Sequence, residues 1–232
     1  MTIFPEERNE KSGNDPKSLL EPILLFFVLF FPGYLSGTDS GQKIDFANLG
    51  FLFRYAAVAL PQILLLLFMI SKKGPGWPER YGITRIKRRD IPGALLLLPL
   101  LLAISFLIAL LFPFGLQESW GMEKRTLLLP AIVAMVITGY REELFFRAYL
   151  LRELSTFLGG EEQRPGWREV TTSSLLFAAG HLYQGWGGAL TTLLIAMVLG
   201  FRYSRKKSLH EVAIAHSLYN SVALIMISFG SY

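Results

Sequence analysis

Ionisable side chains interrupt the apolar stretches in the second half of this chain. Glu142 and Glu143 stand side by side at the end of one apolar stretch, and Arg147 follows four residues after Glu143. His181 and His216 lie in two later apolar stretches. Such groups are costly at membrane depth and mark functional sites there. We therefore expect this set of acids, imidazoles and guanidinium to be used in function.

The spacing within the first group separates the two carboxylates. Adjacent residues on a helix point about 100° apart, whereas residues four apart share a face. Glu143 and Arg147 are thus expected to form an ion pair, which leaves Glu142 free to face a cavity. The alternative is that both acids, together with Arg141, only solvate the cytoplasmic end of the helix.

The histidines and one asparagine add polar groups at other depths. His181 lies about eleven residues into its apolar stretch, or about 16 Å along a helix, although a lone imidazole there could simply bond a neighbouring backbone. His216 and Asn220 are four apart and share a face. An amide can donate hydrogen bonds to an oxygen that gains negative charge, or clamp two helices together. We expect Glu142, His181 and His216 to converge, and His210 to be a surface residue.

Membrane-spanning helices must position these groups. Hydrophobic residues make up 52% of the 232 residues and the mean hydropathy is +0.40. Apolar runs recur at about the 20-residue length that crosses a bilayer. The sequence predicts an all-α, polytopic bundle of about seven spans (six to eight), with a tight turn at Gly185–Gly188. The expected spans are 18–36, 49–70, 91–113, 126–146, 170–187, 189–202 and 211–229.

Basic residues predict the orientation of the bundle. A cytoplasmic N-terminus puts most Lys and Arg residues inside, as the positive-inside rule requires, and Tyr232 outside. The external loops would hold only Lys43, Lys124 and Arg125, with Arg54 near the start of the second span. The inside set is Arg8, Lys11, Lys17, Lys72, Lys73, Arg80, Arg85, Lys87, Arg88, Arg89, Arg147, Arg152, Arg164, Arg168, Arg202, Arg205, Lys206 and Lys207. We expect a multi-pass protein of the cell (inner or plasma) membrane.

Composition excludes several classes of function. The chain has no cysteine, so a disulfide framework, a thiolate metal site and a cysteine nucleophile are impossible. The net charge of +5 fits topology and anionic lipid headgroups, because the basic residues flank the spans, and no nucleic-acid partner is expected. The segment before the first span mixes acids with bases, so that span is expected to be uncleaved.

Three short motifs carry a family resemblance. In order and spacing they are similar to those of the CPBP family, which includes type II CAAX prenyl endopeptidases and bacteriocin-processing or immunity proteins. The resemblance covers roughly residues 131–228. The motifs are Glu142-Glu143-x-x-x-Arg147, Phe177-x-x-x-His181 and His216-x-x-x-Asn220.

The resemblance implies an intramembrane endopeptidase, CAAX-protease-like, and a role for each motif residue. The expected domains are a cytoplasmic tail (1–17), N-terminal helices without a family signature (18–125) and a catalytic core (126–232). The implied substrate is a membrane-embedded or lipidated protein or peptide. The implied roles are Glu142 as the base that activates water, His181 as its positioning partner, His216 and Asn220 as the oxyanion-stabilising pair, and Glu143 with Arg147 as structural support.

Two alternatives remain open from the sequence. Glu142, His181 and His216 form a ligand set known from catalytic zinc sites, so the cofactor is either none or Zn. Metal-free chemistry is favoured because no HExxH motif is present and Asn220 is a poor zinc ligand. A non-proteolytic immunity or partner-binding protein, or a small transporter, could also bury the same polar residues.

Overall fold

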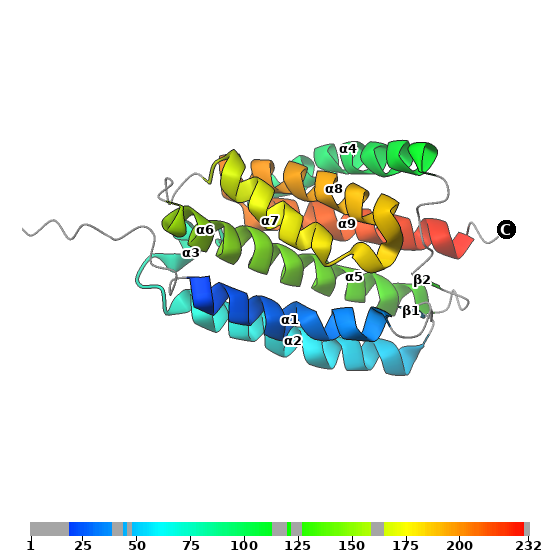
Figure 1. Cartoon of the computed structure of the whole chain (residues 1–232), viewed down its shortest axis with the longest axis horizontal. Helices are drawn as coiled ribbons and strands as arrows, with labels where there is room; N and C mark the ends of the chain where they lie inside the picture. The colour runs from blue at the N-terminus through cyan, green and yellow to red at the C-terminus, as the bar shows by residue number, and fades with distance from the viewer. Residues whose placement is uncertain are drawn as a thin grey trace, which may run out of the picture.

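The molecule is a bundle of long helices that run along a common axis (Figure 1). The computed structural model describes residues 19–38, 44–45, 48–112, 120–121, 127–158 and 165–229. Some residues used in the topology prediction lie outside these ranges, namely those of the tail 1–17, Lys43, Lys124, Arg125, Arg164 and Tyr232. The helices are α1 (Leu20–Thr38), α2 (Leu49–Ser71), α3 (Trp77–Arg80), α4 (Asp90–Leu111), α5 (Leu128–Glu143), the π-helical η3 (Leu144–Leu150), α6 (Leu151–Phe157), α7 (Trp167–Ala179), the 3₁₀-helical η4 (Leu182–Gln184), α8 (Gly185–Lys206) and α9 (Leu209–Phe229). Two-residue strands, β1 (Ile44–Asp45) and β2 (Trp120–Gly121), pair in parallel.

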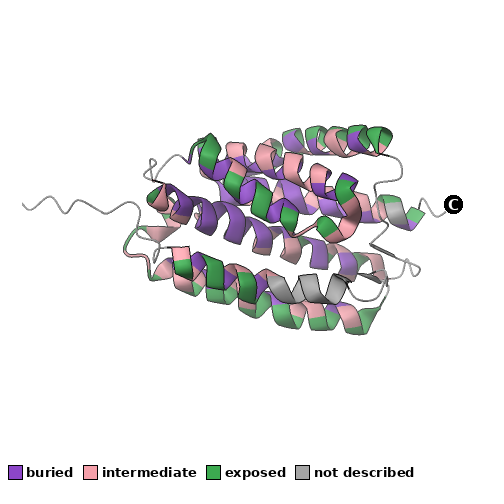
Figure 2. Cartoon of the chain, in the orientation of Figure 1, coloured by how far each residue is buried: buried purple, intermediate pink, exposed green. Residues whose placement is uncertain are grey.

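The expected membrane bundle is confirmed in its class. Each of the expected spans except 170–187 falls on continuous helix where the structure describes it, and in the described part of the chain three helical stretches are long and apolar enough to cross a bilayer: Leu49–Ser71, Asp90–Leu111 and Leu182–Lys206. The outer helices α2 and α4 leave large apolar side chains exposed along their length (Figure 2). Such surfaces suit lipid, since lipid tails are as apolar as leucine.

Helix boundaries differ from expectation around His181. The expected span 170–187 does not exist as one helix, because α7 ends at Ala179 and α8 begins at Gly185. Gly185 has a φ of 80°, a backbone conformation that favours glycine, and the break falls there rather than after it. The predicted turn at Gly185–Gly188 is therefore wrong: Gly187 and Gly188 lie buried in the first turn of α8. His181 belongs to the break, not to the depth of a span.

Helix α5 continues beyond the expected span 126–146. It passes without interruption through η3 into α6 and ends at Phe157. Phe145 and Phe146 of η3 are buried and contact Phe30 of α1, with ring centroids 5.1 and 5.0 Å apart. Aromatic packing of this kind fixes η3 at the centre of the bundle.

Close packing of α5 against α9 brings two motif-bearing helices together. A Cβ atom at Gly139 would lie 3.0 Å from the backbone N of Ser217 and 3.2 Å from the carbonyl O of Ala213, and would overlap the Ser217 hydroxyl. Only glycine allows this approach, as small residues do at helix contacts in membranes. The contact lies one turn before the acidic pair and beside His216.

Candidate active site

The acidic pair lies where α5 becomes η3. Glu142 and Glu143 are both buried, and the π-helical turns that follow carry Arg147 into the core, where it is 1% exposed. Glu143 Oε2 lies 3.0 Å from Arg147 Nε, so the ion pair expected from the spacing is formed. Short π-helical stretches inside α-helices are frequent at functional sites, and this one could not be predicted from the apolar pattern.

His216 joins both carboxylates. Its Nδ1 lies 2.8 Å from Glu143 Oε1, and its Nε2 lies 3.7 Å from Glu142 Oε2. The carboxylate of Glu143 can only accept at Nδ1, so that hydrogen bond assigns a proton to Nδ1 and turns Nε2 toward Glu142. Glu143 therefore orients His216 as well as pairing with Arg147, a second contact that helix spacing could not predict because the two residues are far apart in sequence.

Arg141 was expected only to solvate the end of the helix, but the structure places it against Glu142. Its Nη2 lies 3.5 Å from Glu142 Oε1, and its Nη1 donates to Gln62 Oε1 at 3.2 Å. The guanidinium also stacks near two rings, 5.4 Å from the centroid of Phe30 and 5.6 Å from that of Tyr55. Helices α1 and α2 thus hold a positive charge beside Glu142. The sequence feature that could have predicted this contact is an arginine directly before the two acids, at the end of an apolar stretch.

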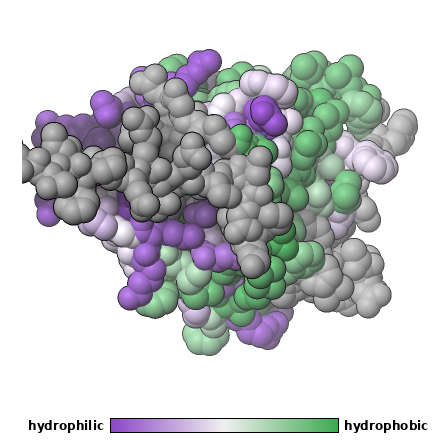
Figure 3. Space-filling model, turned by 60° about the vertical axis from the view of Figure 1, so that its left-hand side comes forward, coloured by the Kyte–Doolittle hydropathy of each residue, from purple (hydrophilic) through white to green (hydrophobic). Residues whose placement is uncertain are grey.

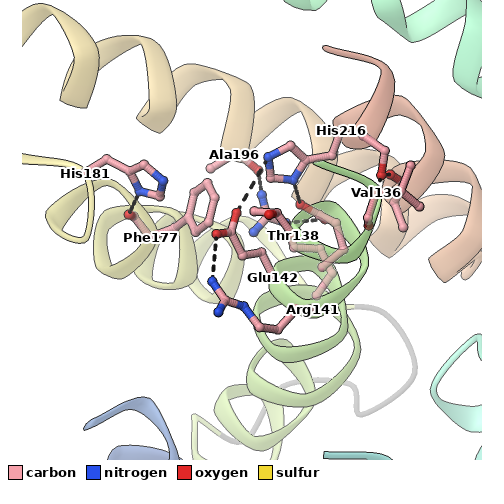
Figure 4. Close-up of polar contacts among 12 residues, drawn as sticks. Val136, Thr138, Arg141, Glu142, Phe177, His181, Ala196 and His216 are labelled. Atoms are coloured by element: carbon pink, nitrogen blue, oxygen red, sulfur yellow. Dashed lines mark hydrogen bonds and ion pairs between the residues drawn. The ribbon is translucent and has the colours of Figure 1, made fainter. Parts of the chain in front are cut away.

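His181 reaches the site through Phe177. Its Nδ1 donates to the carbonyl O of Phe177 over 2.8 Å, which leaves Nε2 without a proton and able to accept a hydrogen bond. The Phe177 ring contacts both imidazoles, with centroids 4.6 Å from His181 and 5.9 Å from His216. In the view of Figure 4, Glu142 lies between the two histidines, and the Arg141 guanidinium lies below its carboxylate.

Asn220 lies one turn beyond His216 on α9 and is buried. The hydroxyl of Ser217, between them in sequence, donates to the carbonyl O of Ala213 at 2.7 Å, so it is satisfied within its own helix. Asn220 follows His216 by four residues on α9, so the amide and the imidazole share one helix face.

His210 is not a free surface residue, so that expectation is wrong. It lies in the first turn of α9 and is half-buried. Its Nε2 is 2.6 Å from the carbonyl O of Thr84 and its Nδ1 is 3.2 Å from the Tyr140 hydroxyl. These bonds fasten the 81–89 segment to the bundle. The neighbouring lysines suggested that His210 is exposed. It is half-buried because the 81–89 segment packs against it through Thr84.

The three candidate zinc ligands are not arranged around one ion in the structure. Among the described residues no group of three or more His, Asp and Glu side chains is placed to share an ion. Nδ1 of His216 is engaged by Glu143 and Nδ1 of His181 by a backbone carbonyl, so only Nε2 of each imidazole could serve as a ligand, and such Nδ1 contacts are also usual for metal-bound histidines.

The fold and the site define a membrane-embedded helical bundle with a buried carboxylate–imidazole centre. A family model described as type II CAAX prenyl endopeptidase Rce1-like matches residues 124–222. Over this segment the chain is similar to that family, which is a family of proteases. The matched segment holds every motif residue and leaves out α1, α2 and α4. No curated protein and no solved structure matches the chain.

Proposed function

We propose that this protein hydrolyses a peptide bond of a membrane-associated protein or peptide, with Glu142 as the base. The observation that carries the proposal is the contact set of His216, which stands between a carboxylate paired by Arg147 and the carboxylate of Glu142. A buried, positioned carboxylate beside imidazoles is suited to take a proton from water. Similarity to a protease family supports the same reaction class.

The proposed reaction uses each motif residue once. Glu142 accepts a proton from a water molecule, which attacks the scissile carbonyl carbon, while Nε2 of His181 accepts the second hydrogen bond of that water. The carbonyl oxygen becomes an oxyanion, which the Asn220 amide and a doubly protonated His216 stabilise. The C–N bond then breaks, and the proton held by Glu142 passes to the leaving amine. Glu143 and Arg147 hold the imidazole of His216 in orientation.

The decisive experiment compares Glu142→Gln with wild type in cells and after purification. We expect a precursor protein to accumulate in membranes of the variant, and the purified wild type, not the variant, to cleave that precursor in lipid nanodiscs. Glu79→Gln is the matched control, because Glu79 is exposed in α3, away from the site. If Glu142→Gln keeps full function, the non-proteolytic alternatives, an immunity or partner-binding protein or a transporter, replace this proposal.

The proposed orientation puts the basic end of the bundle in the cytoplasm. Arg80 Nη2 donates to the carbonyl O of Lys73 at 2.7 Å, and Arg152 Nη1 donates to that of Arg80 at 3.1 Å, so two expected inside segments, those of Arg80 and Arg152, meet at one end. Lys73 also bridges the carboxylates of Glu21 and Glu153, at 2.9 and 3.2 Å. Burial opposes the charge of Lys73, but these carboxylates outweigh it and raise its pKa. The test is an Arg80→Cys variant treated with a membrane-impermeant thiol reagent outside intact cells. Labelling of this cysteine would contradict the proposed orientation.

A further inference from the structure

One amide side chain lies in the apolar part of α2. Gln62 is the only polar side chain between Tyr55 and Ser71 in the sequence of this helix. It lies about 14 Å before the helix end at Ser71. Figure 3 shows hydrophilic residues gathered at that end of the molecule and hydrophobic ones beyond it. A polar group at such a depth needs a partner within the protein, and polar groups there often serve function.

Both ends of the Gln62 amide are used. Its Nε2 donates to the carbonyl O of Leu29 on α1 at 3.3 Å, and its Oε1 accepts from Arg141 Nη1 at 3.2 Å. Because only the amide nitrogen can donate to a carbonyl, the bond to α1 turns the amide oxygen toward Arg141. Gln62 therefore links α1 and α2 to the arginine that precedes the acidic pair.

The position of Arg141 depends on this link. Its Nη2 lies 3.5 Å from Glu142 Oε1, a longer contact than the one to Gln62, and its buried Nε makes no hydrogen bond to any residue that the structure describes. The rings of Phe30 and Tyr55 lie beside the guanidinium, but attraction to a ring face does not fix the direction of each N–H group. Without Gln62, the guanidinium could turn away from Glu142.

The contact with Arg141 distinguishes the two oxygens of Glu142. Oε1 faces the guanidinium, whereas Oε2 lies 3.7 Å from His216 Nε2, and Figure 4 draws both contacts. A carboxylate with one oxygen held presents the other in a fixed direction. Direction matters for the rate, because a misplacement of about 1 Å at a reacting group can cost about 10²-fold.

We propose that Gln62 and Arg141 are positioning residues for the hydrolysis. Gln62 holds Arg141, and Arg141 holds Oε1 of Glu142, so that Oε2 takes the proton of the attacking water. This role rests on the proposed function, because it needs Glu142 to be the base. It also makes α1 and α2, which lie outside the matched segment 124–222, part of the working site.

The test measures kcat and KM of the full chain in lipid nanodiscs, with the purified precursor that accumulates in Glu142→Gln cells as the substrate. Gln62→Leu should lower kcat about tenfold and leave KM within about twofold, because the base is misdirected while the contacts of the substrate remain. Gln62→Glu keeps an oxygen that accepts from Arg141, so kcat should stay within about threefold of wild type.

The matched control is Thr138→Val. It removes another hydrogen bond between α5 and α2, the one that joins the hydroxyls of Thr138 and Tyr55, but it leaves the contacts of Gln62 in place. If Gln62 only fastened the two helices together, both changes would lower kcat alike. We expect Thr138→Val to leave kcat within about twofold, with melting temperatures measured on every variant so that lost folding is not counted as lost rate.

Two further variants test whether Gln62 acts through Arg141. Arg141→Leu should lower kcat about 10–100-fold, and adding Gln62→Leu to it should change kcat by no more than about twofold, whereas independent effects would multiply. Arg141→Lys keeps the charge but not the fork of donors, so it should act like Gln62→Leu, and it decides the matter if that variant does not fold.

Three results would overturn the positioning role while the proposed function stands. They are a wild-type kcat in Gln62→Leu or, if that variant does not fold, in Arg141→Lys, an equal loss in Thr138→Val, and multiplied losses in the double variant. Failure of the wild type itself to cleave the precursor would instead overturn the proposed function, and the positioning role with it.

Discussion

The motif-bearing helices and the helices that precede them meet a lipid environment in different ways. Around α5, η3, α7 and α9, charged side chains are buried to an exposed fraction of 0% for Glu143 and 1% for Arg147, and each finds a partner within the protein. Helices α2 and α4 instead expose apolar side chains, such as Phe53 at 76% and Leu96 at 73%. The first region depends on specific polar pairs, whereas the outward faces of α2 and α4 share only their hydrophobicity.

The largest expected effect separates the two acids of the first region. Glu143→Ala leaves Arg147 buried without its carboxylate and His216 without its acceptor, so unfolding free energy should fall by about 3–5 kcal/mol. Glu142→Ala removes the base and only the 3.5 Å ion pair to Arg141, which keeps its hydrogen bond to Gln62, so cleavage should fall by about 10²–10⁴ with a nearly normal melting temperature. Folded yield, melting temperature and cleavage rate are measured on both. Equal destabilisation by the two substitutions would contradict the assignment of Glu143 to structure and of Glu142 to catalysis.

A smaller effect on rate is expected at Asn220. If its amide stabilises charge that appears only in the transition state, Asn220→Ala should lower kcat by about 10²–10³ and leave binding of an uncleavable substrate unchanged. Ser228→Ala, on the same helix, is the control, because that hydroxyl donates only to its own helix at Leu224. Wild-type cleavage with weak binding would move Asn220 from catalysis to recognition.

Substitutions in the outer helix α4 should lower the free energy of unfolding only where the side chain packs against the rest of the protein. Leu101 of α4 is fully buried, whereas Leu96 on the same helix is mostly exposed. Leu101→Ala should cost about 2 kcal/mol, because packing contacts are lost inside the bundle, and Leu96→Ala should stay within about 0.5 kcal/mol. Reversible unfolding in mixed micelles measures both. Similar costs for the two changes would contradict the lipid-facing assignment of α4.

We expect the removal of metal ions to leave the cleavage activity unchanged. The described part of the chain places no three His, Asp or Glu side chains to share an ion, so activity should survive exhaustive chelation in detergent, and elemental analysis should find no stoichiometric zinc. Loss of cleavage with a chelator and rescue by added zinc would require a rearranged site in which Glu142, His181 and His216 are the ligands.

Local spacing predicted what lies within one helix and missed what joins different helices. The bond between Glu143 and Arg147 follows from a separation of four residues, but the bond between Glu143 and His216 spans α5 and α9. Helix stretches followed from apolar run length. The break at His181 did not, because glycines beside it suggested a turn four residues too late. Arg141 went unassigned because its aromatic partners come from α1 and α2.

The double engagement of Glu143 has a consequence for the divergence of related proteins. The carboxylate of Glu143 serves both the folding of the bundle and the orientation of the imidazole, at 3.0 and 2.8 Å, whereas Glu142 makes only the longer contacts of 3.5 Å to Arg141 and 3.7 Å to His216 beside its proposed role in chemistry. A lineage could therefore discard Glu142 and keep a stable membrane protein, but it could not discard Glu143 as easily. Relatives that retain Glu143, Arg147 and His216 and vary at the position of Glu142 would be pseudoenzymes, with the same bundle put to binding alone.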